Sequence, residues 1–148
     1  EYANQYAAGG EYTLIDGTRG SDEYRTGDWQ GYWAQDLIAE VTFDKPRSLE
    51  IVGLGVLSDM KSWIFLPSEI EFLVSYDGKT FVNLETIKIQ IPVKEDMYPH
   101  HKNFEANTNT NQGILKIRVI AKNHGKCPEW HLGNGNDTWL FADEIYFK

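Results

Sequence analysis

The sequence predicts an all-β domain, an antiparallel β-sandwich or jelly roll. About eight short segments have strand character, and turn-rich stretches separate them. No window shows a helical period with caps, which argues against an α or α/β fold. The 148 residues can bury a core without disulfides, so we predict a single domain over residues 1–148.

The composition excludes several functions. Hydrophobic residues make up 41% of the chain, but 14% of it is aromatic, with five Trp and eight Tyr, so the rings need a core or a ligand. A net charge of −8 without a basic cluster argues against nucleic acid and anionic membrane surfaces. No apolar run is long enough to insert in a membrane. The single cysteine, Cys127, cannot form an internal disulfide and is expected to be a buried thiol.

The first third of the chain combines short strands with one long loop. Residues 12–15 (YTLI) form a strand candidate that ends at Asp16-Gly17. Residues 16–31 are rich in glycine and polar turn formers, which predicts a long ordered loop that a cation could fix through its carboxylates. Residues 37–44 alternate in hydrophobicity, and residues 49–57 are an apolar run with two glycines, so both are predicted strands.

The remaining segments complete the predicted sandwich. Residues 70–76, Asp77-Gly78 and KTFVNL give a hairpin signal, and strand character continues over residues 85–93. Residues 97–112 are polar and predict a connector, whereas residues 114–121 give the clearest strand. Residues 127–137 are a loop of Gly, Asn and Pro with one Trp and one His, and residues 138–148 are the closing strand.

Five ordered motifs carry a family resemblance. LIDG at 14–17, GDWQG at 27–31, VSYDGKTF at 74–81, KIRVIAKN at 116–123 and WLFADEI at 139–145 resemble the discoidin-like (factor V/VIII type C) domain. The resemblance implies an eight-stranded antiparallel jelly-roll β-sandwich of the galactose-binding-domain-like class. SWIFLPSEIEF at 62–72 and NHGKCPEWHLGNG at 123–135 are similar to the subgroup at the C-terminus of bacterial chitobiase-like β-hexosaminidases, which resembles family 32 carbohydrate-binding modules.

The resemblance implies a noncatalytic module that directs an attached glycoside hydrolase to glycans. The expected ligands are N-acetylhexosamine or galactose-type sugars, and the chain is expected to be part of a larger secreted, periplasmic or cell-surface glycosidase. The galactose-recognising His, Arg and Asn set of family 32 modules does not align with this sequence. The alternative is an interaction domain that docks on its parent enzyme through the same aromatic residues.

A lectin site needs an exposed flat aromatic ring beside hydrogen-bonding groups, because a pyranose has an apolar face and a polar rim. Trp139 is expected in the core, and Trp29 in the core or in loop packing. The expected stacking residues and polar partners lie in the predicted loops and are Trp130, Trp63, Trp33, Tyr32, His131, Asp59, Lys61 and His124.

The resemblance also implies a structural calcium ion that ties the first loop to the last strand. In this sequence the matching ligands are Asp16, Thr18, Ser21 and Glu144. Calcium takes hard oxygen ligands, which these residues supply. The alternative is that Asp16 only caps its turn and that Glu144 is solvated. We find no catalytic motif, and the side chains of adjacent His100 and His101 would point to opposite faces of a strand, which disfavours a shared metal.

Overall fold

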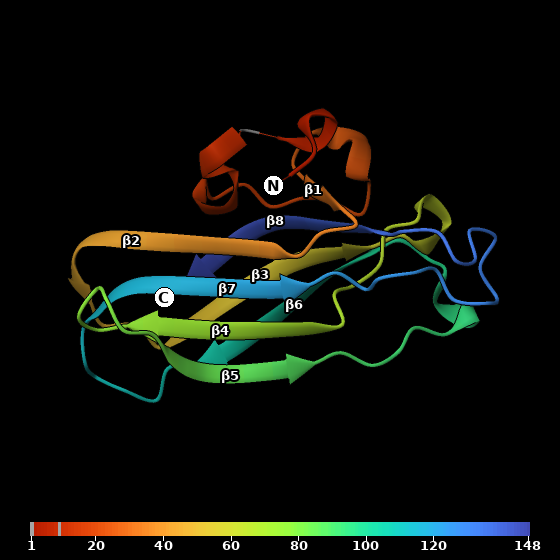
Figure 1. Cartoon of the computed structure of the whole chain (residues 1–148). Helices are drawn as coiled ribbons and strands as arrows, with labels where there is room; N and C mark the ends of the chain where they lie inside the picture. The colour runs from red at the N-terminus through yellow and green to blue at the C-terminus, as the bar shows by residue number, and fades with distance from the viewer. Residues whose placement is uncertain (1, 9) are drawn as a thin grey trace.

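Two four-stranded antiparallel sheets pack face to face in the computed structural model, which describes residues 2–8 and 10–148 (Figure 1). The first sheet has the strand order β1 (Gln30–Trp33), β8 (Trp139–Phe147), β3 (Ile51–Ser58), β6 (His100–Asn107). The second has the order β2 (Leu37–Arg47), β7 (Ile114–Lys122), β4 (Glu69–Ser75), β5 (Val82–Lys88). The predicted eight-stranded sandwich is therefore confirmed.

The main core lies between the two sheets. In β4 the residues Ile70, Phe72 and Val74 face inward and are fully buried, while the residues between them stay partly exposed, as strand alternation requires. The central strand β3 is buried along almost its whole length, because one face meets the core and the other is covered. The core is apolar and continuous across both sheets.

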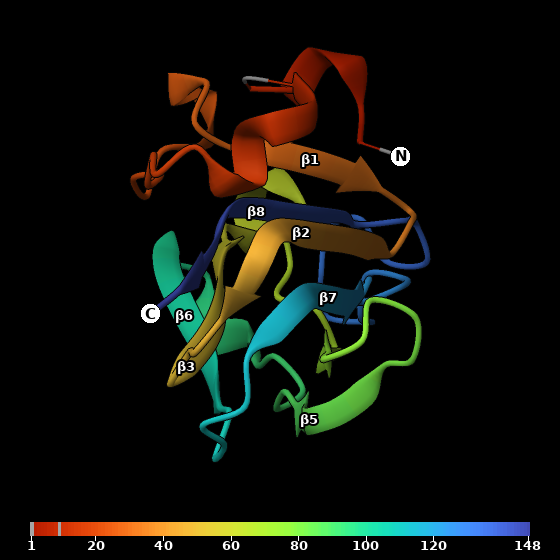
Figure 2. The same ribbon diagram turned by 90° about the vertical axis from the view of Figure 1, so that its left-hand side faces the viewer.

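A second apolar layer covers the outer face of β1 and β8. The chain before β1 contains the short 3-10 helices η1 (Asn4–Tyr6), η2 (Gly10–Ile15) and η3 (Tyr24–Thr26), which lie over these strands in both views (Figures 1 and 2). Trp29 is 1% exposed in this layer and packs with Phe141, which agrees with its expected place in the core or in loop packing. Trp139 is only partly buried at the edge of the same cluster, so its predicted place in the core is wrong.

A β-bulge in β8 sets the position of two carboxylates. Val56 of β3 pairs with Ala142 and Leu54 pairs with Ile145, so Asp143 and Glu144 together lie opposite Gly55. A Cβ at Gly55 would collide with the Asp143 carboxylate and come within 2.6 Å of Arg19 Nη2. Only glycine leaves room for the buried acid at this position.

Several local predictions need correction. Residues 12–15 belong to the 3-10 helix η2 and not to a strand. Residues 97–112 contain β6 and are not only a connector. Tyr32 and Trp33, expected in a loop, end strand β1. Strand character stops at Lys88, and the chain then continues to β6 through the short 3-10 helix η5 (Lys94–Asp96).

None of the helices within residues 2–8 and 10–148 is long and apolar enough to cross a membrane.

Truncation of the central core ring should show how strongly the stability depends on the sandwich interior. Phe72→Ala is expected to lower the free energy of unfolding by about 3–5 kcal/mol, because it leaves a cavity between the sheets. Ile38→Ala on β2 is the matched control, since Ile38 is 66% exposed, and it should cost less than about 1 kcal/mol. Urea denaturation measures both, and equal losses would contradict this assignment of the core.

Candidate functional site

Three tryptophans meet at one end of the sandwich. Trp33 ends β1, Trp139 begins β8, and Trp63 follows the 3-10 helix η4 (Met60–Ser62). The ring centroids of Trp33 and Trp63 lie 6.4 Å apart with an interplanar angle of 24°, and those of Trp33 and Trp139 lie 5.1 Å apart. All three rings are half-buried. We call Trp33, Trp63 and Trp139 the tryptophan row.

Backbone geometry fixes Trp63 in this row. Trp63 adopts a left-handed conformation with φ 65°, and its N–H donates to the Met60 carbonyl at 3.1 Å, which ends η4. Positive φ is uncommon for a bulky residue and marks a position that the surroundings enforce. A Cβ at Gly133 would come within 2.9 Å of the Trp63 ring, so the 127–137 loop closes against this indole only because Gly133 has no side chain.

His131 is buried and holds that loop in place, which contradicts the expectation of an exposed sugar contact. The residue is 6% exposed. Its Nε2 donates to the Met60 carbonyl at 2.5 Å, and its Nδ1 accepts from the Gly133 N–H at 2.9 Å. Both ring nitrogens are used internally, so none remains for a hydroxyl of a sugar.

Trp130 is half-buried and not the bare ring expected at the loop tip. It packs against the small cluster of Met60, Phe65 and Cys127, together with Met97. The buried Cys127 is the structural thiol that the sequence predicted. The fully exposed residue of this loop is Leu132, at 104%.

Two more candidates are buried, which corrects their prediction as ligand contacts. The Tyr32 hydroxyl donates to Gln30 Oε1 at 2.6 Å, and burial, with the nearby Tyr2, raises the pKa of Tyr32 far above its ordinary value. Asp59 is 7% exposed and its backbone pairs with Ile64 around η4; burial raises the pKa of its carboxyl.

The other two polar candidates differ in exposure. Lys61 is exposed on η4, two residues from Trp63, as a sugar contact requires. His124 is half-buried with its ring stacked on Phe65 at 4.7 Å, and burial lowers the pKa of His124.

The bulge carboxylates organise the first loop. The Gly17 N–H donates to Glu144 Oε1 at 3.0 Å, and the Gly20 N–H donates to Asp143 Oδ2 at 2.8 Å. The Arg19 Nε donates to the same Asp143 oxygen at 3.0 Å. Asp143 was not among the predicted site residues, although a DE pair within an apolar strand is the sequence signal that could have indicated it.

The predicted calcium ligands are only partly brought together. Asp16 lies near enough to Glu144 to raise its pKa, and Glu144 Oε2 is buried without a hydrogen-bond partner. Asp16 Oδ1 accepts from the Thr18 N–H at 2.8 Å. Ser21 is a poor ligand, because its hydroxyl bonds to the Glu23 backbone and its carbonyl accepts from Trp29 Nε1. Two carboxylates, one of which has a buried oxygen without a partner, fit a cation that completes its shell with backbone oxygens.

No cluster of three or more His, Cys, Asp or Glu residues that suits a metal ion occurs within the described part of the chain. A transition-metal centre therefore has no ligand set in those residues, whereas calcium needs fewer side-chain ligands because it accepts carbonyl and hydroxyl oxygens.

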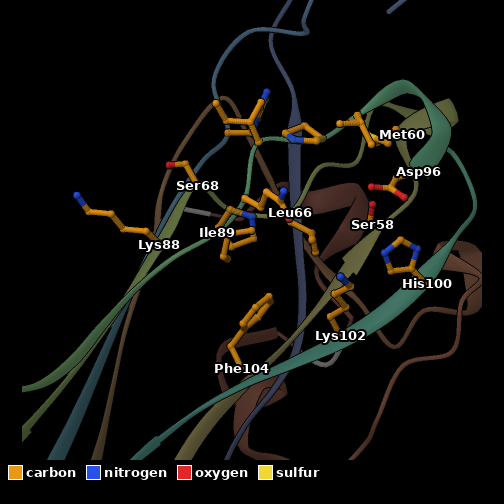
Figure 3. A pocket seen from close by; sticks show the side chains of 16 residues that line it. Ser58, Met60, Leu66, Ser68, Lys88, Ile89, Asp96, His100, Lys102 and Phe104 are labelled. Carbon is orange, nitrogen blue, oxygen red and sulfur yellow. The ribbon is translucent and has the colours of Figure 1, made fainter.

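A pocket of about 490 Å³ opens between the edge strands β5 and β6 (Figure 3). Figure 3 shows Lys102, His100, Ser58 and Asp96 on one side of it and Leu66, Ile89 and Phe104 on the other. Lys88 extends away from the pocket. Sequence reasoning missed this pocket, because β6, which forms one wall, was expected to be a connector.

Comparison with solved structures finds the same fold in carbohydrate-binding modules. A CBM32 module from a family 31 glycoside hydrolase of Clostridium perfringens has a TM-score of 0.52 and 17% identity, over 95% of this chain and 85% of that chain. A CBM32 module produced by Clostridium perfringens, in complex with GlcNAc-α-1,4-galactose, has a TM-score of 0.56 and 10% identity, over 100% and 88%. A pectin-binding module has a TM-score of 0.52 and 14% identity, over 100% and 85%.

At these identities the comparison shows a shared fold, the antiparallel β-sandwich that the sequence predicted. No protein-family model and no curated protein matches the chain.

The buried carboxyl of Glu144 should give the stability a measurable pH dependence. Burial, and then the neighbouring Asp16 and Asp143, raise the pKa of Glu144 from 4.5 to about 7, although the Gly17 N–H opposes the shift. The folded chain therefore binds this proton more tightly than the unfolded chain. The stabilisation is complete below pH 4.5 and is lost as the pH rises through about 7.

The substitution Glu144→Gln keeps this side chain neutral at every pH. At about pH 8 the variant should be more stable than the wild type by on the order of 1 kcal/mol, a figure that includes solvent screening at the loop. Near pH 4.5 the two proteins should differ little in their free energy of unfolding. Urea denaturation in calcium-free buffer measures this difference. Glu85→Gln, on the exposed side of β5, is the control and should show no such crossover. A Glu144→Gln curve parallel to the wild type across this range would be evidence against the buried carboxyl.

Proposed function

We propose that this domain is a noncatalytic carbohydrate-binding module and that the tryptophan row binds the sugar. In this proposal the module directs an attached chitobiase or β-hexosaminidase-type glycoside hydrolase to glycans outside the cell. The observation that carries the proposal is the row itself, in which half-buried indoles gather at one end of a rigid sandwich. The modules of similar fold, one in complex with GlcNAc-α-1,4-galactose and one pectin-binding, support it.

The geometry suits weak binding of a pyranose. Covering about 60–80 Å² of a sugar face at ~25 cal/mol/Å² contributes roughly 1.5–2 kcal/mol before any hydrogen bond forms. Half-buried rings are already held in position by their neighbours, so little side-chain entropy is lost on binding. Lys61 supplies an exposed donor beside Trp63. A module tethered to an enzyme needs only such modest affinity, because attachment raises its effective concentration at the glycan.

Calcium completes the proposal as a structural ion. Asp16 and Glu144 would hold it, with the Thr18 hydroxyl or backbone carbonyls of the loop as further ligands. When bound, the ion neutralises two neighbouring carboxylates and ties the first loop to β8. The unpartnered Glu144 Oε2 supports this assignment.

A second candidate is an interaction domain that docks on its parent enzyme. The observation that favours it is the exposure of Leu132, Ile91 and Tyr98 on loops around the same end, at 104%, 81% and 76%. Exposed apolar residues of this size can form a protein interface when they are contiguous. If the folded chain binds none of the sugars tested below, this candidate is favoured.

Removal of the Trp63 indole, at one end of the row, should weaken sugar binding. Calorimetry against N-acetylglucosamine, N-acetylgalactosamine and galactose is expected to detect at least one ligand, and Trp63→Ala should lower its affinity by about tenfold or more, equivalent to ~1.4 kcal/mol. Trp63→Phe should retain part of the affinity, because a smaller ring still stacks. Tyr12→Ala, at an exposed ring away from the row, is the control. Unchanged binding by Trp63→Ala would remove the row from the site.

Calcium should stabilise the folded chain. At a free concentration about 100-fold above Kd, the ion is expected to add ~2.7 kcal/mol to the free energy of unfolding, seen as a higher Tm. Asp16→Asn and Glu144→Gln should abolish the increase, whereas Asp44→Asn, an exposed carboxylate at the far end of β2, should not. A Tm that does not respond to calcium in the wild type would refute this part of the proposal.

A further inference from the structure

The pocket between β5 and β6 is built from inward-facing positions of β6. Ala106, Phe104, Lys102 and His100 pair with Val52, Leu54, Val56 and Ser58 of β3, respectively, so they share the face that lines the core. Along this face the side chains change from apolar to polar toward one end of the strand. The sandwich interior therefore opens into a cavity whose inner part is apolar and whose outer part is polar (Figure 3).

The polar side chains of this cavity are not occupied by protein partners. Among the described residues, no hydrogen bond or ion pair engages the Lys102 ammonium or the Asp96 carboxylate. His100 donates from Nδ1 to the Tyr98 carbonyl at 2.8 Å, which fixes the ring and leaves Nε2 as an acceptor. The hydroxyl of Ser58 lies on the same side. The cavity is therefore lined by four groups without a hydrogen-bond partner among the described residues, namely the Lys102 ammonium, the Asp96 carboxylate, the His100 Nε2 and the Ser58 hydroxyl.

The cavity also has an apolar wall, to which β6 contributes Phe104. Leu66, Ile89 and Phe104 pack against the main core with part of their surface left open to the cavity. The cavity volume of about 490 Å³ lies within the range of about 300–1000 Å³ that small-molecule sites have. A ligand with one apolar face and several hydroxyl groups would satisfy both walls.

We propose that this pocket is a second sugar subsite, separate from the tryptophan row, that takes a neutral pyranose unit. This inference rests on the proposed carbohydrate-binding function. The Asp96 carboxylate accepts hydrogen bonds from adjacent hydroxyls, Lys102 donates to a sugar oxygen, and the apolar face of the ring lies on Phe104 and Leu66.

The charge balance selects a neutral ligand over an acidic one. Lys102 contributes one positive charge and Asp96 one negative charge, and burial lowers the pKa of His124, so this imidazole adds no charge near neutral pH. The outward-facing Lys88 lies beside Glu69 of β4, which offsets its charge. An inward lysine on an edge strand can also discourage strand pairing, but that role requires no cavity.

The pocket and the tryptophan row share the segment around η4. Met60 lines the pocket, and its carbonyl accepts hydrogen bonds from His131 and from the Trp63 N–H. A glycan of several units would therefore be able to contact both sites at one end of the sandwich, and each site would add to the affinity of the other.

The test is a two-dimensional amide NMR titration of the whole chain with two neutral disaccharides, N,N′-diacetylchitobiose and lactose, and with digalacturonate as the acidic probe. At least one neutral disaccharide is expected to shift the amides of residues 89–96 and 100–104. Asp96→Asn and Lys102→Met should each weaken this binding by about tenfold or more, because each leaves a sugar hydroxyl without its partner. The matched controls Glu95→Gln and Lys94→Met, neighbours on η5 outside the pocket, should stay within about twofold.

The outcomes separate the two sites. Shifts of the pocket amides that depend on Asp96 and Lys102 support the subsite, whether or not the tryptophan row also responds. Shifts confined to residues 63 and 139 would leave the proposed function intact and overturn the subsite. Binding of digalacturonate alone, strengthened by Asp96→Asn, would overturn the neutral class of ligand. No shift with any probe would overturn both the subsite and the proposed function.

Discussion

The bulge that places Asp143 and Glu144 opposite Gly55 is the constraint on which the outer half of this domain depends. A regular strand would send adjacent side chains to opposite faces, whereas the extra residue lets two adjacent carboxylates reach the same loop. They accept hydrogen bonds from the N–H groups of Gly17 and Gly20. A loop with no regular structure thereby gains long-range bonds to a central strand.

The fixed loop in turn supports the aromatic end of the molecule. Gly20 lies against the Trp29 ring, and Trp29 Nε1 donates to the carbonyl of the following residue, Ser21, at 2.9 Å. Trp29 packs in the same outer cluster as Phe141, and Trp139 lies at the edge of that cluster. The Trp139 ring contacts the Trp33 ring, which in turn stacks on the Trp63 ring. The proposed sugar platform is thus a consequence of packing that begins at the bulge, which explains how half-exposed rings stay in one orientation.

The sequence predicted the elements whose residue pattern lies within the element itself, and it missed those that depend on distant contacts. Strands such as β7 and β8 were predicted because their apolar residues follow the strand period. Strand β6 was missed because its inner face ends in Lys102 and His100, and this inward polarity is also what makes the pocket. Burial of His131 depends on how the 127–137 loop closes on Met60, more than 60 residues earlier in the sequence, and no local pattern encodes such a contact. The tryptophan row was predicted in part. Trp33 and Trp63 were expected to stack on a sugar, whereas Trp139 was expected in the core.

The most direct test of this account is amide hydrogen exchange at Gly17 and Gly20. If the bulge carboxylates hold the loop, both amides should exchange as slowly as neighbouring amides of β8 and should lose their protection in Asp143→Ala and Glu144→Ala. Exchange of these two amides at the rate of an exposed loop in the wild type, with β8 protected, would contradict the claim that β8 organises the outer layer.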